Sequence, residues 1–184
     1  MAFTDPDLIA RVLARQDQNA FAELVRRHQS PVRAFLRRLT RGHAPLADDL
    51  AQETFVKSWQ RLSTYRGDAP FSTWLFGIAF NEFRSAARRR QELALADVDE
   101  PPFSLEAAGS EPAHALRLDL AAALDTLTVG ERAAIVLCCQ NGLSHADAAQ
   151  VLACPLGTVK TNVLRGKEKL RQRLALDYEE YASA

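Results

Sequence analysis

The sequence predicts an all-helical protein made of two small domains joined by a flexible acidic linker, with a helix-turn-helix in the second domain. Apolar residues recur at three- and four-residue spacing along the 184-residue chain, which is typical of amphipathic helices, and signals for strands are almost absent. Residues 96–115 interrupt this pattern with three prolines, five acidic residues and no basic residue. Near the C-terminal end, a short helix of small residues, a tight turn and a basic helix follow one another.

The first two helices are predicted from their end signals and their apolar faces. Asp5 is expected to cap the first helix, with Pro6 at the first helical position. The second helix is expected to bend or break near Pro31, because an internal proline removes a backbone hydrogen bond, and to stop at Gly42. The expected apolar residues are Leu8, Ile9, Val12 and Leu13 in the first helix and Phe21, Leu24, Val25, Val32, Phe35, Leu36 and Leu39 in the second.

Two further helices complete the predicted N-terminal domain. The third is expected over residues 46–62, with Asp48 and Asp49 in its first turn, where the helix dipole favours negative charge. Residues 64–70 contain glycine, aspartate and proline and therefore indicate a loop. A long helix is expected over residues 72–90. Its expected inward face comprises Trp74, Leu75, Ile78 and Ala79.

The acidic stretch divides the chain into residues 1–95, a linker of residues 96–115, and residues 116–184. The first part carries 15 basic and 10 acidic residues, whereas the last part carries eight of each. Proline, serine, glycine and unbalanced charge are typical of flexible linkers. At about 3.3 Å per residue, a linker of this length spans at most about 66 Å, so the two domains are expected to be able to sit well apart on a large partner.

The C-terminal domain is predicted to begin with two helices and a capped third. Helices are expected to open at Leu116 and again over residues 131–140, and Gly142 is expected to stop the second. Ser144 and Asp147 resemble a capping box, so a short helix is expected to start at Ser144.

The final helix, predicted over residues 157–174 after a tight turn, has one packing side and one basic side. On a helical wheel the packing side holds Val159, Val163, Gly166, Leu170 and Leu174, and the opposite side holds Lys160, Thr161, Leu164 and Arg165. Lysine and arginine reach guanine acceptors, while threonine and leucine meet thymine methyl groups. This side is therefore predicted to read duplex DNA in the major groove, with Lys167 and the later bases holding phosphates.

Three sequence motifs occur in a family-specific order. They are residues 48–55 followed by Trp59, residues 65–74 with residues 78–81, and residues 142–161. These segments resemble regions 2.2, 2.3–2.4 and 4.2 of bacterial sigma factors of the extracytoplasmic-function (ECF) group, which contain only sigma regions 2 and 4. The resemblance covers nearly all of residues 3–175. It implies a transcription initiation factor that binds core RNA polymerase, directs it to specific promoters and opens the minus-10 region.

The resemblance also implies where each partner binds. Docking on the beta-prime clamp helices of polymerase is assigned to Asp48, Asp49, Gln52 and Glu53. Capture of the unpaired minus-10 strand is assigned to Tyr65, Arg66, Gly67, Asp68, Asn81, Arg84 and Arg88. Contact with the minus-35 element is assigned to Lys160, Thr161, Leu164, Arg165 and Lys167. The polymerase beta flap and an anti-sigma factor are further implied partners.

The family pattern is not followed everywhere. The chain departs from it at His145, Asp147, Asn162 and Gly166. Gly166 stands where alanine is common, and glycine within a helix is expected to cost about 1 kcal/mol relative to alanine.

Neither metal chemistry nor catalysis is expected. Cys138, Cys139 and Cys154 form no C-x-x-C pair and have no histidine cluster beside them, so no metal and no cofactor are predicted. The sequence has no uncharged apolar run of about 18 residues and no signal-peptide pattern, so we expect a cytoplasmic protein without membrane insertion.

Two alternatives to a sigma factor stay open at this point. One is a helix-turn-helix regulator that acts without polymerase. The other is a DNA-processing enzyme such as a recombinase, which would need a nucleophile beside a carboxylate or arginine cluster. Ser30, Ser58 and Ser63 have no such setting in the sequence.

Overall fold

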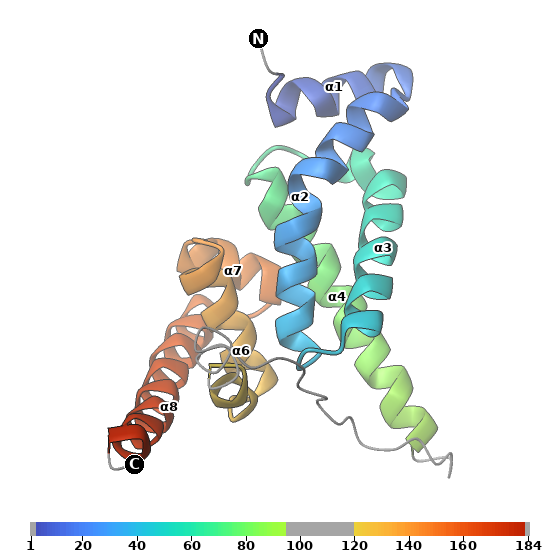
Figure 1. Ribbon diagram of the computed structural model, residues 1–184. Coiled ribbons are helices and arrows are strands. Elements are labelled where there is room, and N and C mark those ends of the chain that lie inside the picture. Colours follow the sequence, from blue (N-terminus) through green and yellow to red (C-terminus); the bar gives the residue numbers. More distant parts are fainter. Residues whose placement is uncertain (1–2, 95–119, 183–184) are drawn as a thin grey trace.

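The computed structural model describes residues 3–94 and 120–182, and all regular structure in these two ranges is helical (Figure 1). The all-helical prediction is therefore confirmed. The predicted linker and the helix start at Leu116 lie outside the described residues. The elements are α1 (Asp5–Arg15), α2 (Gln18–Leu39), α3 (Ala44–Arg61), η1 (Leu62–Thr64), α4 (Phe71–Ala94), α6 (Val129–Ile135), η2 (Val136–Gln140), α7 (His145–Leu152) and α8 (Leu156–Ala182), with a further helical segment at residues 120–125.

The first helix begins at Asp5, one residue earlier than predicted. Thr4 caps α1, because its hydroxyl accepts from the backbone N–H of Asp7 at 3.4 Å while the Asp7 carboxylate accepts from the N–H of Thr4 at 2.9 Å. The carboxylate of Asp5 instead contacts α2, at 3.0 Å from Arg27 and 2.7 Å from Nε2 of His28. The prediction that Asp5 caps this helix was wrong, because Asp5 joins α1 to α2.

The second helix continues through its internal proline. Asp17 caps α2 by accepting from the N–H of Ala20 at 3.0 Å, and the helix then runs to Leu39 without the predicted break at Pro31. Val32, the next residue, and Phe35, one turn further on, are buried and hold this part of α2 in the core. Gly42 ends the helical region as predicted, with a left-handed φ of 86° that favours glycine.

The third helix also starts earlier than predicted. The ring nitrogen Nδ1 of His43 accepts from the N–H of Leu46 at 2.8 Å and caps α3, so the helix starts at Ala44. The first turn consequently contains no acid, and Asp48 and Asp49 lie beyond it. The predicted dipole interaction at these two residues was therefore wrong, because the histidine cap moves the helix start.

The last two helices form the predicted helix-turn-helix. Ser144 caps α7 by accepting from the N–H of Asp147 at 3.1 Å, but its own hydroxyl donates to the Asp147 carboxylate at 2.6 Å, so only half of the predicted capping box forms. The turn passes through Ala153 at φ 49°. The N–H of Thr158 then donates to the carbonyl of Pro155 at 2.9 Å and starts α8.

The preceding helix changes its winding before it ends. Thr128 and Glu131 form a complete capping box at the start of α6. The predicted helix over residues 131–140 begins as α6 and finishes as the π-helical turn η2, after which Gly142 adopts φ 70°. The position of the helix and its stop at Gly142 are thus as predicted.

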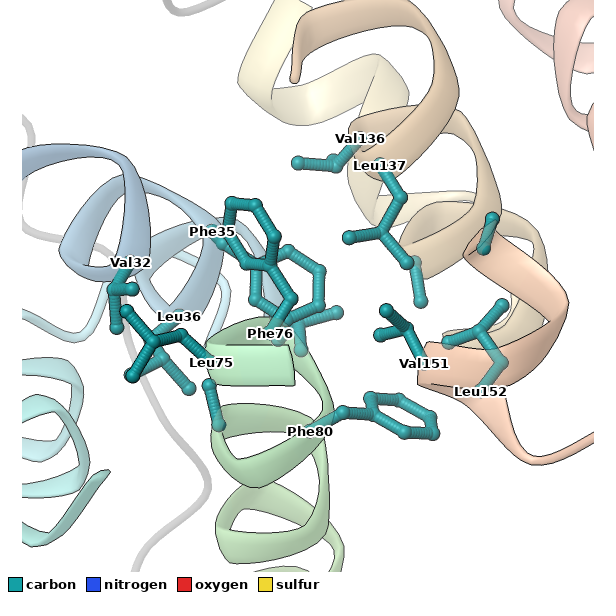
Figure 2. Packing of buried hydrophobic residues seen from close by; sticks show 14 of the residues in the cluster. Val32, Phe35, Leu36, Leu75, Phe76, Phe80, Val136, Leu137, Val151 and Leu152 are labelled. Atoms are coloured by element: carbon teal, nitrogen blue, oxygen red, sulfur yellow. The ribbon is translucent and has the colours of Figure 1, made fainter. Parts of the chain in front are cut away.

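Apolar side chains join the two halves of the molecule along a surface that we call the seam. Figure 2 shows Phe80 of α4 pointing toward Val151 and Leu152 of α7, and all three side chains are at most 6% exposed. In the same view Phe35 and Phe76 point toward Leu137, which is fully buried. In this structure the two halves therefore share one continuous core.

A buried arginine adds polar contacts at the seam. The guanidinium of Arg132, 1% exposed as a residue, donates to the carbonyls of Leu124 at 3.0 Å and Leu127 at 3.2 Å. It also reaches the carbonyl of Arg38 on α2 at 3.5 Å. Burial lowers the pKa of Arg132, against the opposing influence of Asp125, whose carboxylate lies 3.6 Å from it. Arg132 thus ties the start of the C-terminal unit to the end of α2.

Candidate functional site

The predicted docking residues lie on α3, and three of the four share an exposed face. Asp49, Gln52 and Glu53 are exposed, and Val56 extends the same face with 53% of its surface exposed. Asp48 is turned toward α2, where its carboxylate lies 2.9 Å from Nε of Arg33. We call residues 49, 52, 53 and 56 the α3 face; it combines two carboxylates, an amide and an apolar side chain.

An apolar hollow adjoins the α3 face. It has a volume of about 400 Å³ and is lined by Gln18, Phe21, Phe55, Val56 and Trp59. The rings of Phe21 and Trp59 meet edge to face with their centroids 4.9 Å apart. Phe55 and Trp59 are half-buried here. An acidic face beside an apolar hollow is suited to a protein partner that is basic and partly apolar.

Five of the seven predicted minus-10 residues, all but Arg84 and Arg88, line a second cavity, which we call the loop pocket. Its volume is about 390 Å³, and the loop of residues 64–69 forms one wall. Tyr65 donates its hydroxyl to the carbonyl of Ala69 at 2.7 Å, which closes the loop on itself. Gly67 has φ 80°, a conformation that residues with a Cβ rarely adopt. Burial, followed by the charges of Asp5 and Asp68, raises the pKa of Tyr65, so the phenol stays protonated.

The opposite wall of the loop pocket comes from α4. Trp74, predicted as a core residue, is half-buried and lines this pocket, with its ring stacked on Phe71 at a centroid distance of 5.6 Å. Asn81 also lines the pocket, and Arg84 and Arg88 continue along the exposed side of α4. The indole therefore presents an aromatic surface to the cavity, which is suited to stacking on an unpaired base.

Sequence reasoning missed several walls of the loop pocket. Arg61, Thr64 and Thr73 line it from the ends of the neighbouring helices. In the sequence, only their position close to the predicted loop could have indicated that these residues line the pocket. Gln150 and Val151 of α7 close the pocket from the other side of the seam, and no local pattern in the sequence indicates this long-range contact.

The predicted minus-35 residues form an exposed stripe on α8, the recognition face. Lys160, Thr161, Leu164, Arg165 and Lys167 are all exposed, and Leu164 is 72% exposed. On the other side of the helix, Val159, Val163 and Gly166 are buried. The hydroxyl of Thr161 donates to the carbonyl of Gly157 at 2.9 Å, which leaves its methyl group available for apolar contact.

Two of the later basic residues of α8 have partners within the protein. The ammonium of Lys169 lies 2.8 Å from the carboxylate of Glu131 and joins α8 to α6. Arg171 lies 2.9 Å from Glu168 on the exposed surface. Lys169 consequently has a structural role in the protein.

Within residues 3–94 and 120–182, no group of three or more His, Cys, Asp or Glu side chains is arranged to hold a metal ion. Burial raises the pKa of the Cys138 and Cys154 thiols, so both are weak nucleophiles at neutral pH. None of the helices in these ranges is long and apolar enough to cross a membrane.

Comparison with known proteins matches both halves of the chain to one family. Residues 24–92 match the model of Sigma-70 region 2, and residues 117–170 match that of Sigma-70, region 4. The ECF RNA polymerase sigma factor SigE of Mycolicibacterium smegmatis is 36% identical over 88% of this chain, which spans 64% of that relative. The RNA polymerase sigma factor NccH of Alcaligenes xylosoxydans xylosoxydans is 32% identical over 91% of this chain and 95% of its own length.

Solved structures give the same result. The sigma factor RpoE of Bartonella quintana, in complex with the anti-sigma factor NepR, superposes with a TM-score of 0.73 at 30% identity, covering 85% of this chain and 98% of its own. CnrH, in complex with the cytosolic domain of CnrY, superposes with a TM-score of 0.68 at 31% identity, covering 94% of this chain and 98% of its own.

Proposed function

The chain belongs to the ECF group of sigma factors, and from this premise we propose how its three surfaces divide the work of transcription initiation. Residues 1–95 act as region 2, residues 96–115 as the linker and residues 116–184 as region 4. The α3 face, the loop pocket and the recognition face lie on different helices, and each can meet a different partner. This separation is the observation that carries the proposal.

The α3 face docks on the beta-prime clamp helices of core RNA polymerase. Asp49, Gln52 and Glu53 supply charge and hydrogen bonds that set the orientation, and Val56 with the apolar hollow supplies buried area. Asp48 supports this face indirectly, because its ion pair with Arg33 fixes α3 against α2. The beta flap is the proposed partner of the C-terminal half.

The loop pocket captures an unpaired base of the minus-10 element. Opening duplex DNA costs about 1.4 kcal/mol per base-pair step, and a factor that hydrolyses no nucleotide recovers this by binding the opened strand. A flipped base can stack on Trp74 and hydrogen-bond to Asn81, while Arg66, Arg84 and Arg88 follow the phosphates. Tyr65, Gly67 and Asp68 shape the loop that receives the base.

The recognition face reads the minus-35 element as duplex. Lys160, Thr161, Leu164 and Arg165 are placed to contact base edges in the major groove, and Lys167 contacts phosphate. Sigma factors are generally not enzymes, and we assign no catalytic residue and no cofactor to this chain. We place the protein in the cytoplasm, where polymerase and promoter DNA are found.

An anti-sigma factor is a further proposed partner. RpoE of Bartonella quintana and CnrH were solved in complex with NepR and with CnrY, respectively, and both superpose on this chain. The closed seam supports the proposal, because it places Gln150 and Val151 of α7 against the loop pocket. A protein that bound across both halves would hold the pocket covered.

Pull-down on core RNA polymerase followed by run-off transcription tests this function. Wild-type chain is expected to bind core enzyme and to yield promoter-specific RNA. Asp49→Lys/Glu53→Lys is expected to lose binding at least tenfold, since two favourable charge contacts become repulsive. Glu92→Lys/Glu168→Lys makes the same charge change on other exposed surfaces and should bind normally. Equal loss in both variants would refute the docking assignment, and promoter-specific RNA without this chain would refute the function.

A further inference from the structure

A third cavity lies at the seam, and its walls are unusually basic. It has a volume of about 340 Å³ and lies between the end of α2, the helical segment at residues 120–125, and Gln140. Three arginines line it: Arg37, Arg38 and Arg41. We call this cavity the seam pocket. We propose that it binds a small phosphate-bearing anion, such as a pyrophosphate or a nucleoside diphosphate, and that binding holds the two halves together.

The carboxylates that the structure describes around the seam pocket do not balance its positive charge. Arg38 is half-buried, and its guanidinium pairs with no side chain in the described part of the chain. Arg41 lies 3.9 Å from Asp125, the one carboxylate among the described residues that line the cavity, and that carboxylate is shared with Arg132. Arg37 lies 4.0 Å from Asp48, whose closer partner is Arg33 at 2.9 Å. Within residues 3–94 and 120–182, at least two positive charges at the cavity therefore have no carboxylate of their own.

The remaining walls fit the rest of such a ligand. Guanidinium groups bind phosphate through paired, charge-assisted hydrogen bonds, and an anion bridging two arginines gains affinity from both. Gln140 is exposed at the rim and offers an amide. Ala34, Ala121 and Leu124 form an apolar wall against which an organic group can pack. A cavity of this size lies within the range found for small-molecule sites.

The position of the seam pocket favours a small anion over nucleic acid. Its walls come from both halves of the protein, so it exists only while the seam is closed. In the proposed function the two halves separate to reach two promoter elements, and the pocket is then lost. A ligand that needs the closed form must by linkage favour that form. Binding of the anion is therefore expected to reduce promoter binding. That consequence rests on the proposed function, whereas the binding of the anion itself does not.

Isothermal titration of the full chain with sodium pyrophosphate at constant ionic strength tests the site without polymerase or DNA. One saturable site is expected for the wild type. Arg38→Ala/Arg41→Ala should weaken it by at least an order of magnitude. Lys160→Ala/Arg165→Ala removes the same charge from the exposed recognition face and should bind as the wild type does. Circular dichroism confirms that both variants fold.

A pair of charge changes at the rim separates binding from a structural effect. Gln140 is exposed, so both substitutions should leave the fold intact. Gln140→Lys is expected to tighten pyrophosphate binding severalfold and Gln140→Glu to weaken it by a similar factor. Binding in which the two variants behave alike would overturn the proposal.

Other outcomes would also overturn it. If the wild type showed no saturable binding up to about 10 mM pyrophosphate, any affinity would be too weak to be useful, and the proposed site would be refuted. Equal weakening in the recognition-face control would indicate non-specific attraction to basic protein. Loss of affinity for duplex DNA in Arg38→Ala/Arg41→Ala, with no pyrophosphate binding by the wild type, would make these arginines nucleic-acid contacts instead.

Discussion

At the scale of single residues, one buried charged side chain, that of Arg132, stabilises the folded protein. Arg132 is a long basic residue that no helical pattern identifies as a core residue, yet it is almost fully buried. Its guanidinium satisfies the carbonyls of Leu124 and Leu127 at the end of the 120–125 helical segment. The Leu124 carbonyl also accepts from the N–H of Leu127 at 3.2 Å, whereas Arg132 is the donor that the structure gives to the Leu127 carbonyl beyond the end of the segment.

Replacing Arg132 tests this role. Arg132→Ala is expected to lower the free energy of unfolding by about 3–5 kcal/mol, because it leaves the Leu127 carbonyl without its donor, removes the nearer cation from Asp125 and empties a buried site. Urea denaturation followed by circular dichroism measures the loss. Arg26→Ala removes an arginine whose side chain is 73% exposed and should cost less than about 1 kcal/mol. Similar losses in the two variants would contradict the assignment.

Glu131 gives a pH-dependent contribution. Burial opposes its ionisation, but the Lys169 ammonium and the N–H and hydroxyl of Thr128 outweigh this and lower its pKa below the ordinary 4.5. The ionised form thus favours the folded state above about pH 4.5, and that contribution disappears as the pH falls through the lowered pKa.

Glu131→Gln is therefore expected to be less stable than the wild type at pH 7, by about 1.5–3 kcal/mol. The difference should shrink steadily below pH 4.5, where the wild-type carboxylate becomes protonated. Urea denaturation at a series of pH values measures it, with Glu92→Gln on the exposed end of α4 as the control. A difference that stays constant from pH 7 to pH 3 would show that the charge of Glu131 is irrelevant.

At the scale of helices, the periodicity of apolar residues was enough to place the elements, and the helix ends were less predictable. Leu75 and Ala79 repeat at helical spacing and are fully buried as expected. The starts of α1 and α3 were misplaced because Thr4 and His43 provide the caps. Which residue caps a helix depends on which nearby side chain accepts from its first backbone N–H groups. The carboxylate of Asp5 does not cap α1, because it contacts Arg27 and His28 of α2, which are distant in sequence.

Gly166 shows how packing overrides helix propensity. The sequence suggested that this glycine only weakens the last helix. In the structure a Cβ at this position would lie 2.8 Å from Cγ1 of Ile135, so glycine allows α8 to approach α6 closely. The close approach also brings Lys169 within reach of Glu131.

Gly166→Ala is consequently expected to destabilise the protein by about 1–3 kcal/mol, the cost of overpacking, despite the gain in helix propensity. Thermal unfolding followed by circular dichroism measures it. Gly157→Ala lies in the same helix, where a Cβ would meet nothing within 4 Å, and should be neutral or stabilising. Stabilisation of Gly166→Ala to the same degree as Gly157→Ala would contradict the packing argument.

At the scale of the whole molecule, the seam was the feature that the sequence could not show. Phe80, Val151 and Leu152 look like ordinary core positions of separate helices, and only the three-dimensional arrangement brings them together (Figure 2). Likewise, the motifs predicted the residues of the loop pocket on α4 but not its closure by Gln150. Contacts across the seam join segments far apart in the chain, which local patterns do not encode.

The closed seam and the proposed function require different arrangements. The minus-35 and minus-10 elements are about 25 base pairs apart by their names, or about 85 Å of duplex at 3.4 Å per base pair. In the closed form α7, the first helix of the helix-turn-helix, lines the loop pocket itself, so the two DNA surfaces belong to one compact body (Figure 1). The halves must therefore separate on the promoter, within the roughly 66 Å that the linker allows.

The distance between the two halves, measured by pulsed electron paramagnetic resonance, tests this account most directly. Spin labels at the exposed positions Ala14 on α1 and Gln172 on α8 would be placed in a chain whose three cysteines are replaced by alanine. The account predicts a single distance in the free protein and a distance longer by about 30 Å or more in the complex with core polymerase and promoter DNA. An unchanged distance in a complex that actively transcribes would contradict it.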